Sequence, residues 1–335
     1  MMNAIPLSRA SQLLPFLGFL DGIGAPTESA LERNKLPANL SQNPEMLIST
    51  RAMTRFVGET ARCEGIEGLG WRVVPLSRTV LSTRMTGALR TCSTLLQAVE
   101  TVVGNAGYES SNLGFWLEET EDSVFICHRG SIELGFEGTH QMTLMRTAII
   151  LSIVRLFTPP DWVPSDVGLA SESGIEPIVQ DELLGAKIWP TRNYGWLRLP
   201  RSILARPPRA RWPAARSSQE AGAEPELDLV GSLRQLLRSH LTPGAPTIQD
   251  AADLAGISVR SLQRELARAG TSYRNLLGGV KLDRARELLR QPDLPILEVA
   301  LEAGFKDPAN FTRFFKSLTS LSPREYRRHQ VEGRG

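Results

Sequence analysis

Residues Pro295–Tyr326 read P-I-L-E-V-A-L-E-A-G-F-K-D-P-A-N-F-T-R-F-F-K-S-L-T-S-L-S-P-R-E-Y, and this stretch decides the fold of the C-terminal third. Ile296, Val299 and Ala300 recur at i, i+3 and i+4, the spacing of one helix face. Gly304 then supplies the left-handed residue that ends many helices. The stretch therefore begins with a short helix followed by a tight turn.

A second helix is predicted to start at Asp307-Pro308, because Asp caps free backbone N–H groups and Pro fits a first helical turn. Its apolar side chains fall on one face: Phe311, Phe314, Phe315 and Leu318. A short helix, a Gly turn and a helix with an apolar back and a polar, basic front are the plan of a helix-turn-helix.

The same pattern occurs earlier in the chain. Ile248–Ile257 matches Ile296–Phe305 in its Ile, Ala and Gly positions, at a constant offset of 48 residues. Thr247 and Asp250 resemble a capping box before this earlier helix. Between the two copies, Ser272–Arg290 has the apolar spacing of a long connecting helix. The sequence thus predicts an all-α C-terminal domain with two helix-turn-helix units.

Charge is unevenly distributed along the chain. The net charge is only +2, but the part from Leu227 onward has 17 Lys and Arg against 12 Asp and Glu, which leaves −3 for the rest. A basic C-terminal third is the electrostatic footprint expected of a nucleic-acid binder, although many solvated helix faces are also basic.

On a helical wheel, Val259–Ala269 buries Leu262, Leu266 and Ala269 and turns its Arg and Gln side chains outward. Arg can read guanine and Gln can read adenine in the major groove of double-stranded DNA. The predicted DNA-binding residues of the first unit are Ser258, Arg260, Ser261, Gln263, Arg264 and Arg268. Those of the second unit are Lys306, Asp307, Ala309, Asn310, Thr312, Arg313 and Lys316. Because the second set holds fewer bidentate readers, we expect the first unit to supply most of the sequence discrimination.

Residues 1–205 are predicted to form one α+β domain, 206–226 a linker rich in Pro, Arg and Ala, and 227–335 the helical domain. Arg206, Arg209, Arg211 and Arg216 of the linker could touch phosphate, but a solvated tether is the favoured interpretation. The elements expected in the first domain are helices at Pro44–Arg62, Thr86–Asn105 and Thr139–Phe157, a hairpin of Leu113–Glu118 and Ser123–His128, and strands at Lys187–Trp189 and Trp196–Leu199.

An enzyme requires a nucleophile, an acid–base pair or a metal site, and the sequence offers none of these clearly. Cys127 and His128 are adjacent in a predicted strand, so their side chains point to opposite faces. The four histidines have no metal-ligand spacing, and the three cysteines are far apart without a C-x-x-C pattern. We therefore predict no enzymatic activity, no metal and no cofactor, and free thiols in a reducing cytoplasm.

No apolar run is long enough to span a membrane. Leu13–Leu20 is apolar and near the N-terminus, but Pro15 interrupts it and no charged region precedes it, so a signal peptide is not expected.

The C-terminal motifs resemble the DNA-binding domain of the AraC/XylS family of bacterial transcription regulators, over roughly Leu227–Arg328. The residues that carry this resemblance are A-x-x-x-G-I-S-x-R-x-L-Q-R at Ala252–Arg264, A-x-x-L-L at Ala285–Leu289, I-x-E-V-A-L-E-A-G-F at Ile296–Phe305, F-x-R-F-F-K at Phe311–Lys316 and S-P-x-x-Y-R at Ser322–Arg327. Two departures are Thr319-Ser320, where the family usually has an aromatic residue and Gly, and Gly278-Gly279 inside the connecting helix.

In that family one monomer places two recognition helices in successive major grooves, about 34–36 Å apart. The layout of residues 1–205 is similar to the arabinose-binding-like sensor domain of the ornithine-utilisation and quorum-sensing regulator branch. The resemblance implies a bacterial cytoplasmic, nucleoid-associated homodimer that responds to a small molecule and contacts RNA polymerase if it is an activator.

The effector and its binding residues stay unassigned at this point. Five tryptophans could line a ligand cavity, but core packing is the favoured role for most: Trp71, Trp116, Trp162, Trp189 and Trp196. The alternatives to an effector-controlled regulator are a nucleoid-type protein that binds any duplex and an enzyme-like N-terminal domain fused to a DNA-binding module.

Overall fold

The computed structural model describes residues 4–74, 81–130, 136–170, 175–191, 194–209, 224–226, 228–241 and 244–332. The chain forms two compact units, the N-terminal unit of Pro6–Pro225 and the C-terminal unit of Glu226–Gly335 with Met1–Ile5. The predicted order, an α+β part followed by an all-α part, is confirmed. Arg211 and Arg216 of the expected linker lie outside the described residues.

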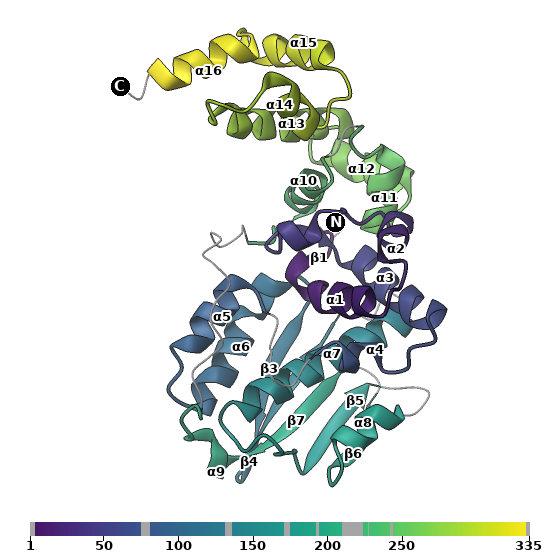
Figure 1. Cartoon of the computed structure of the whole chain (residues 1–335), viewed down its shortest axis with the longest axis vertical. Helices are drawn as coiled ribbons and strands as arrows, with labels where there is room; N and C mark the ends of the chain where they lie inside the picture. Colours follow the sequence, from purple (N-terminus) through teal and green to yellow (C-terminus); the bar gives the residue numbers. More distant parts are fainter. Residues whose placement is uncertain are drawn as a thin grey trace. The chain divides into compact units, whose positions relative to one another are not determined.

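The N-terminal unit is built on a five-stranded sheet in the order β3-β4-β7-β5-β6 (Figure 1). All neighbouring strands are antiparallel except the pair β5 and β6. The strands are β3 (Gly114–Glu119), β4 (Ser123–Arg129), β5 (Asp166–Ala170), β6 (Lys187–Thr191) and β7 (Gly195–Pro200). The predicted hairpin is β3–β4, and the two later predicted strands are β6 and β7.

Helices cover this sheet and a smaller two-stranded sheet of β1 (Leu7–Arg9) and β2 (Leu47–Ser49). Helix α7 runs across one face of the large sheet, packing on β5 and β7, and it also contacts α3 and α4 (Figure 1). The helices of this unit are α1 (Leu14–Gly22), α2 (Thr27–Arg33), α3 (Thr50–Cys63), α4 (Leu69–Arg72), α5 (Thr83–Arg90), α6 (Leu95–Glu109), α7 (Phe136–Arg155), α8 (Pro177–Glu182) and α9 (Arg201–Leu204).

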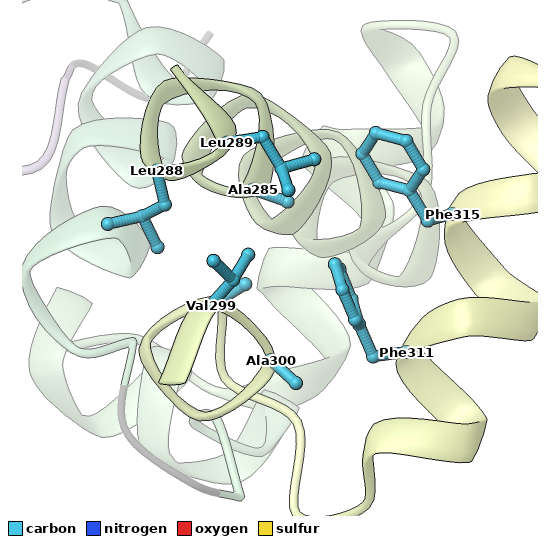
Figure 2. Close-up of a cluster of buried hydrophobic side chains, with 8 residues drawn as sticks. Ala285, Leu288, Leu289, Val299, Ala300, Phe311 and Phe315 are labelled. Atoms are coloured by element: carbon cyan, nitrogen blue, oxygen red, sulfur yellow. The ribbon is translucent and has the colours of Figure 1, made fainter. Parts of the chain in front are cut away.

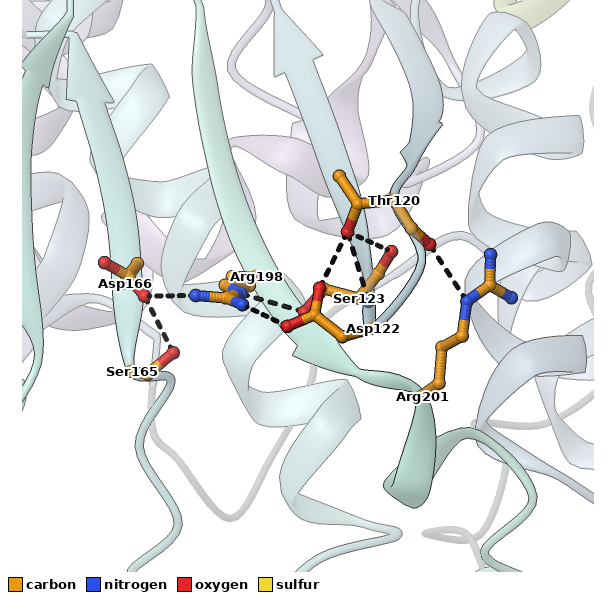
Figure 3. Close-up of polar contacts among 7 residues, drawn as sticks. All are labelled: Thr120, Asp122, Ser123, Ser165, Asp166, Arg198 and Arg201. Carbon is orange, nitrogen blue, oxygen red and sulfur yellow. Dashed lines mark hydrogen bonds and ion pairs between the residues drawn. The ribbon is translucent and has the colours of Figure 1, made fainter.

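One arginine ties the ends of three strands together (Figure 3). The Arg198 guanidinium on β7 contacts Asp122 at 2.7 Å in the β3–β4 turn and Asp166 at 3.2 Å on β5. Its Nε also donates to the Ser123 hydroxyl at 2.8 Å on β4. The planar fork of Arg suits this role, because its donors point in fixed directions. These contacts fix how β4, β7 and β5 are aligned at this end of the sheet.

Two helix boundaries in this unit were predicted wrongly. The expected helix Thr86–Asn105 is two helices, because the Thr94 side chain caps α6 by accepting from Gln97 N at 3.3 Å. Gly104 lies inside α6 rather than ending it, which is tolerable because a helical Gly costs only about 1 kcal/mol. The helix expected from Pro44 begins only at Thr50, since β2 occupies the preceding residues.

The C-terminal unit contains only helices among its described residues: α10 (Leu229–Ser239), α11 (Ile248–Ala255), α12 (Val259–Arg268), α13 (Tyr273–Leu289), α14 (Ile296–Glu302), α15 (Pro308–Thr319) and α16 (Pro323–Glu332). We call α11–α12 the first head and α14–α15 the second head. Helix α13 is the predicted connecting helix, and it continues unbroken through Gly278 and Gly279. This departure from the family pattern therefore does not break the helix.

The second head rests on an aromatic and aliphatic core shared with α13 (Figure 2). Phe311 and Phe315 are fully buried and their ring centroids lie 5.7 Å apart. They meet Leu289 of α13 and Val299 of α14. Leu318, expected on the same buried face, is 52 % exposed, because it falls beyond the part of α15 that this core covers.

In the part of the chain that the structure describes, no helix combines the length and apolarity needed to cross a bilayer.

Candidate nucleic-acid interface

The first head begins with the predicted capping box. Thr247 and Asp250 each accept a hydrogen bond from the other's backbone N–H, at 3.2 and 3.0 Å. Gly256 then ends α11 with φ of +73°, a conformation that favours glycine. Ser258 caps α12 by accepting from Ser261 N at 3.1 Å. These local choices fix the direction in which α12 leaves the turn.

Helix α12 has two chemically distinct faces. Leu262 and Leu266 are buried, at 0 % and 1 % exposure. The opposite side is solvent-exposed and holds four of the predicted DNA-binding side chains: Arg260, Gln263, Arg264 and Arg268. Ser261 is half-buried next to its cap, and Ala269, expected on the buried side, is exposed at the helix end. The exposed face combines guanine and adenine readers in one row.

Glu265 is a site residue that the sequence analysis missed. It lies between the two faces, 8 % exposed, and its Oε1 accepts from Arg268 Nη1 at 2.7 Å and from Arg264 Nε at 3.3 Å. Burial alone would raise the pKa of Glu265, but the hydrogen bonds from these arginines outweigh it and hold the pKa below its ordinary value. One carboxylate therefore positions two exposed arginines. Its spacing next to Arg264 and three residues before Arg268 was the available signal.

The second head has a turn one residue longer. Its first helix aligns with that of the first head at an offset of 48, but Lys306 is inserted before the cap. Asp307 caps α15, accepting from Ala309 N at 2.9 Å and from Asn310 N at 3.2 Å. From the cap onward the structural offset is therefore 49, not 48.

This register decides which outward residues are equivalent. Arg264 corresponds to Arg313, so both heads present an arginine at the same place. The remaining outward pairs are Arg260 with Ala309, Ser261 with Asn310, and Gln263 with Thr312. The second head therefore keeps one arginine and has shorter side chains at the places of Arg260 and Gln263.

The outward side chains of α15 are also partly organised. Arg313 Nη2 donates to Asn310 Oδ1 at 2.5 Å, and the Thr312 hydroxyl donates to its own helix at Pro308 O, 3.0 Å away. Lys306 and Lys316 are exposed. Thr312 is half-buried, which leaves less of its hydroxyl for a partner.

Helix α13 fastens both heads. The Tyr273 hydroxyl donates to Pro246 O at 2.6 Å, just before the first head. Lys281 Nζ donates to Gly304 O at 2.9 Å in the turn of the second head and lies 4.4 Å from the centre of the Phe305 ring. A single helix thus holds the turns of two recognition helices within one unit.

The N-terminal unit offers no arrangement for nucleophilic catalysis at the residues considered. Cys127 is buried, and burial, reinforced by Glu118, raises the pKa of its thiol to about 12. The neighbouring His128 bonds Thr147 Oγ1 at 3.0 Å instead of the thiol. No group of three or more His, Cys, Asp or Glu side chains suited to a metal occurs among the described residues.

This unit does contain two adjoining cavities, both lined by Gln12, Leu113 and Arg146. None of the five tryptophans considered above lines either cavity. Trp71, for example, is buried in the core, whereas Trp189 is 42 % exposed.

Curated relatives match segments of this chain. The Ornithine utilization regulator of Pseudomonas aeruginosa is 33 % identical over 154 residues, covering 44 % of this chain and 45 % of the relative. The Transcriptional activator NphR of a Rhodococcus species is 32 % identical over 99 residues, covering 30 % of each. The activator RhaS of an Enterobacter species is 32 % identical over 113 residues, covering 33 % of this chain and 40 % of the relative. The chain thus spans less than half the length of these relatives.

Two family models match the chain. A helix-turn-helix domain model matches residues 251–329, which include both heads. The model of the arabinose-binding domain of AraC transcription regulators matches residues 24–208, more than half of the chain. The chain therefore belongs to the family of AraC transcription regulators.

Proposed function

We propose that this protein regulates transcription by binding specific double-stranded DNA sequences through α12 and α15. The observation that carries this proposal is the exposed Arg and Gln face of α12 on a fully buried Leu face, repeated in plainer form on α15. A helix of this kind fits the major groove. Two such helices on one connecting helix suit successive grooves on one side of the duplex.

The outward residues divide by chemistry into two roles. Arg260, Gln263, Arg264 and Arg313 have the side chains that read base edges, and Ala309 can contact a thymine methyl group. Asn310 can also read adenine, and Ser261 stands at a base-reading position by the family resemblance. Phosphate contacts fix the register of the protein without reading sequence, and the remaining side chains suit them: Arg268, Lys306, Thr312 and Lys316. Ser258 and Asp307 act through their caps, because each side chain is already engaged with backbone N–H groups.

The domain proposal follows the sequence: residues 1–205 as the sensor and dimerisation domain, 206–226 as the linker and 227–335 as the DNA-binding domain. The N-terminal domain would respond to a small molecule, form a homodimer, or both. The names of two relatives, both transcriptional activators, support an activating role. An activator would have RNA polymerase as a partner, and the protein would act in the bacterial cytoplasm, associated with the nucleoid.

Selection of bound duplexes from a random-sequence pool, followed by footprinting, tests the proposal. Wild-type protein should enrich one asymmetric site that spans two major grooves. Arg260→Ala and Arg264→Ala should each lose about 1–3 kcal/mol of discrimination at particular base pairs of one half of the site. Lys316→Ala is the matched control: it should weaken binding to all duplexes equally and lower the salt dependence.

Uniform, salt-sensitive binding of every duplex would instead favour a nucleoid-type protein. If both Arg variants keep the selectivity of wild type, the assignment of α12 as the main reader is wrong. Residues 227–335 alone should bind the selected site without any response to small molecules, and loss of all DNA affinity in this fragment would contradict an independent reading domain.

A further inference from the structure

The N-terminal unit contains a buried cation that no carboxylate of the described residues neutralises. Arg146, on the central helix α7, is 8 % exposed and lines both cavities. Its Nη2 donates to Thr143 Oγ1 at 2.9 Å on the preceding helical turn, and its Nε has no hydrogen-bond partner. No Asp or Glu among the described residues lies within ion-pair distance of it. A buried charge without a partner costs several kcal/mol, so such a group calls for an explanation.

Among the described residues, the surroundings of Arg146 supply no carboxylate that forms an ion pair with it. Burial lowers the pKa of Arg146 to about 10, and no carboxylate opposes this effect. Burial and the Arg146 cation together lower the pKa of His128 well below its ordinary value, so that ring stays neutral. Gly130 leaves the guanidinium uncovered: a Cβ there would lie 3.2–3.3 Å from its terminal nitrogens.

The first cavity, about 330 Å³ of unfilled space partly open to solvent, combines Arg146 and apolar side chains with neutral polar groups. Ser8 bonds Thr50 and Ser110 at 2.8 Å each, and Ser110 donates to Asn112 at 2.6 Å. These hydroxyl and amide groups largely satisfy one another. They can orient a polar ligand group but cannot neutralise the guanidinium.

The second cavity, about 510 Å³ of unfilled space partly open to solvent, is mostly apolar. The residues on its walls include Met85 of α5, Val102 and Ala106 of α6, Phe115 of β3, and Met145 and Ile149 of α7. Apolar walls with a few polar groups at one place are the composition typical of a small-molecule site.

Glu109 is the one carboxylate among the described residues on the wall of the second cavity, and its surroundings differ from those of Arg146. It accepts a hydrogen bond from the Ser82 hydroxyl, and its closest charged neighbours are Arg9 and Glu45. Burial raises the pKa of Glu109 to about 7, so this wall carries only partial charge near neutral pH. It therefore neither neutralises Arg146 nor strongly repels an anion.

We propose that the two cavities together bind a small organic carboxylate, with its anionic group on Arg146 and its apolar body between α5, α6 and α7. A single charge is favoured because Arg146 is the one cation among the described residues that line either cavity. A phosphate dianion would leave one negative charge buried and uncompensated. The ligand would complete the ion pair that the protein leaves open, with bidentate geometry available to the guanidinium. This inference names the class of effector for the function proposed above and rests on it.

Calorimetric titration of the full chain with matched ligand pairs tests the inference. The pairs are the straight-chain carboxylates from butanoate to decanoate with their amides, and phenylacetate with phenylacetamide; octyl phosphate is the dianionic comparison. We expect at least one carboxylate to bind roughly tenfold or more tighter than its amide, since charge-assisted hydrogen bonds are about twice as strong as neutral ones. Absence of binding by every carboxylate, or tighter binding of octyl phosphate than of octanoate, would overturn the assignment.

Variants on α7 separate a ligand cation from a structural one. Arg146→Met should abolish the preference for carboxylate over amide while the melting temperature of the unliganded protein stays the same or rises, because an unpaired buried charge is removed. Arg146→Lys should retain part of the preference. Arg155 is the control on the same helix, paired with Glu182 at 3.8 Å and bonded to Trp162 O at 2.9 Å. Arg155→Met should lower the melting temperature and keep the preference.

A structural role would give a different result. Arg146→Met would then lower the melting temperature strongly, and both Arg146→Met and Arg146→Lys would keep the preference for carboxylate. Ala106→Leu fills the apolar cavity and should weaken the longer carboxylates more than butanoate. None of these titrations contains DNA. A negative titration would therefore contradict the ligand site without affecting the evidence for selective DNA binding. Conversely, a protein that binds a carboxylate but shows no selective DNA binding would contradict the proposed regulatory function and not the ligand site.

Discussion

The two heads share one backbone plan but hold their equivalent arginines in different ways. In the first head, the buried carboxylate of Glu265 fixes Arg264 together with Arg268. In the second, the neutral amide oxygen of Asn310 holds Arg313. The residue at the place of Glu265 in the second head is Phe314, whose ring lies 5.1 Å from that of Phe305. One position thus holds two arginines in the first head and carries a half-buried aromatic ring in the second.

This difference shows how a repeated scaffold divides labour. A side chain at the boundary of a recognition helix can either organise readers or extend the core, but it cannot do both. The first head uses it for organisation and keeps a small aliphatic core around Leu262. The second head uses it for aromatic packing, and the Phe314 ring lies 3.7 Å from the place that a Cβ on Gly278 of α13 would occupy. We therefore expect the first head to dominate reading and the second to dominate stability.

The largest effect should come from the buried rings. Phe311→Ala should destabilise the second head by about 3–5 kcal/mol, because Phe311 is fully buried and its truncation leaves a cavity. The equivalent Leu262→Ala should cost the first head about 2–5 kcal/mol, toward the lower end of that range. Hydrogen exchange of α14–α16 and of α11–α12 measures the two effects separately. A loss below about 1 kcal/mol in Phe311→Ala would break the comparison.

Periodicity was a good guide to the helical part because each head follows strong local rules. Gly256 and Gly304 both adopt positive φ, as their place after an apolar helix predicts. The N-terminal unit was harder to predict. Its strand β5 is only five residues long with Gly168 at its centre, and its pairing with β6 and β7 depends on residues distant in sequence. The apolar spacing of Thr86–Asn105 predicted one continuous helix, but the side chain of Thr94 caps the start of α6 and separates it from α5.

The next effect separates the two arginines. Arg264→Ala should lose about 1–3 kcal/mol of base discrimination, whereas Arg313→Ala should lose about 1 kcal/mol or less, because the first head also has Arg260 and Gln263 beside its arginine. Binding of single-base variants of the selected site, at one fixed salt concentration, measures both losses. Equal losses would show that the heads read sequence to the same extent.

A helical wheel is enough to name the outward residues of each head. It does not show which residues of the two heads occupy equivalent positions. The inserted Lys306 changes the offset from 48 to 49, and only the cap at Asp307 reveals this shift. The role of Glu265 was likewise hidden, because a wheel shows which side a residue faces and not which partner it finds. Arg146 was missed for a related reason: a lone Arg in an apolar helix gives no sign of whether a carboxylate lies opposite.

A smaller effect is expected where the recognition helices end. Ser320 ends α15 with φ of +63°, whereas Gly270 follows α12 with φ of +71° and has no neighbour within 4 Å of a would-be Cβ. Ser320→Gly should stabilise the second head by about 0.5–1 kcal/mol by relieving a left-handed non-Gly residue. Gly270→Ser should destabilise the first head by a similar amount, about 0.5–1 kcal/mol. Urea unfolding measures both, and equal signs would contradict the explanation.

The smallest effect is the acid sensitivity of the first head. Because the folded pKa of Glu265 lies below its ordinary value, its ion pairs contribute stability above the unfolded pKa of about 4.3, and this contribution disappears as pH falls through the folded pKa. Glu265→Gln removes the charge at every pH, so its stability should be lower than that of wild type at pH 7 and equal to it at low pH. The arginines are exposed, so the difference should be small and should shrink with salt.

The second head offers the control, since Asn310 does not titrate: Asn310→Ala should shift stability by the same amount at both pH values. A gap between wild type and Glu265→Gln that persists below the folded pKa would show that Glu265 acts by packing rather than by charge.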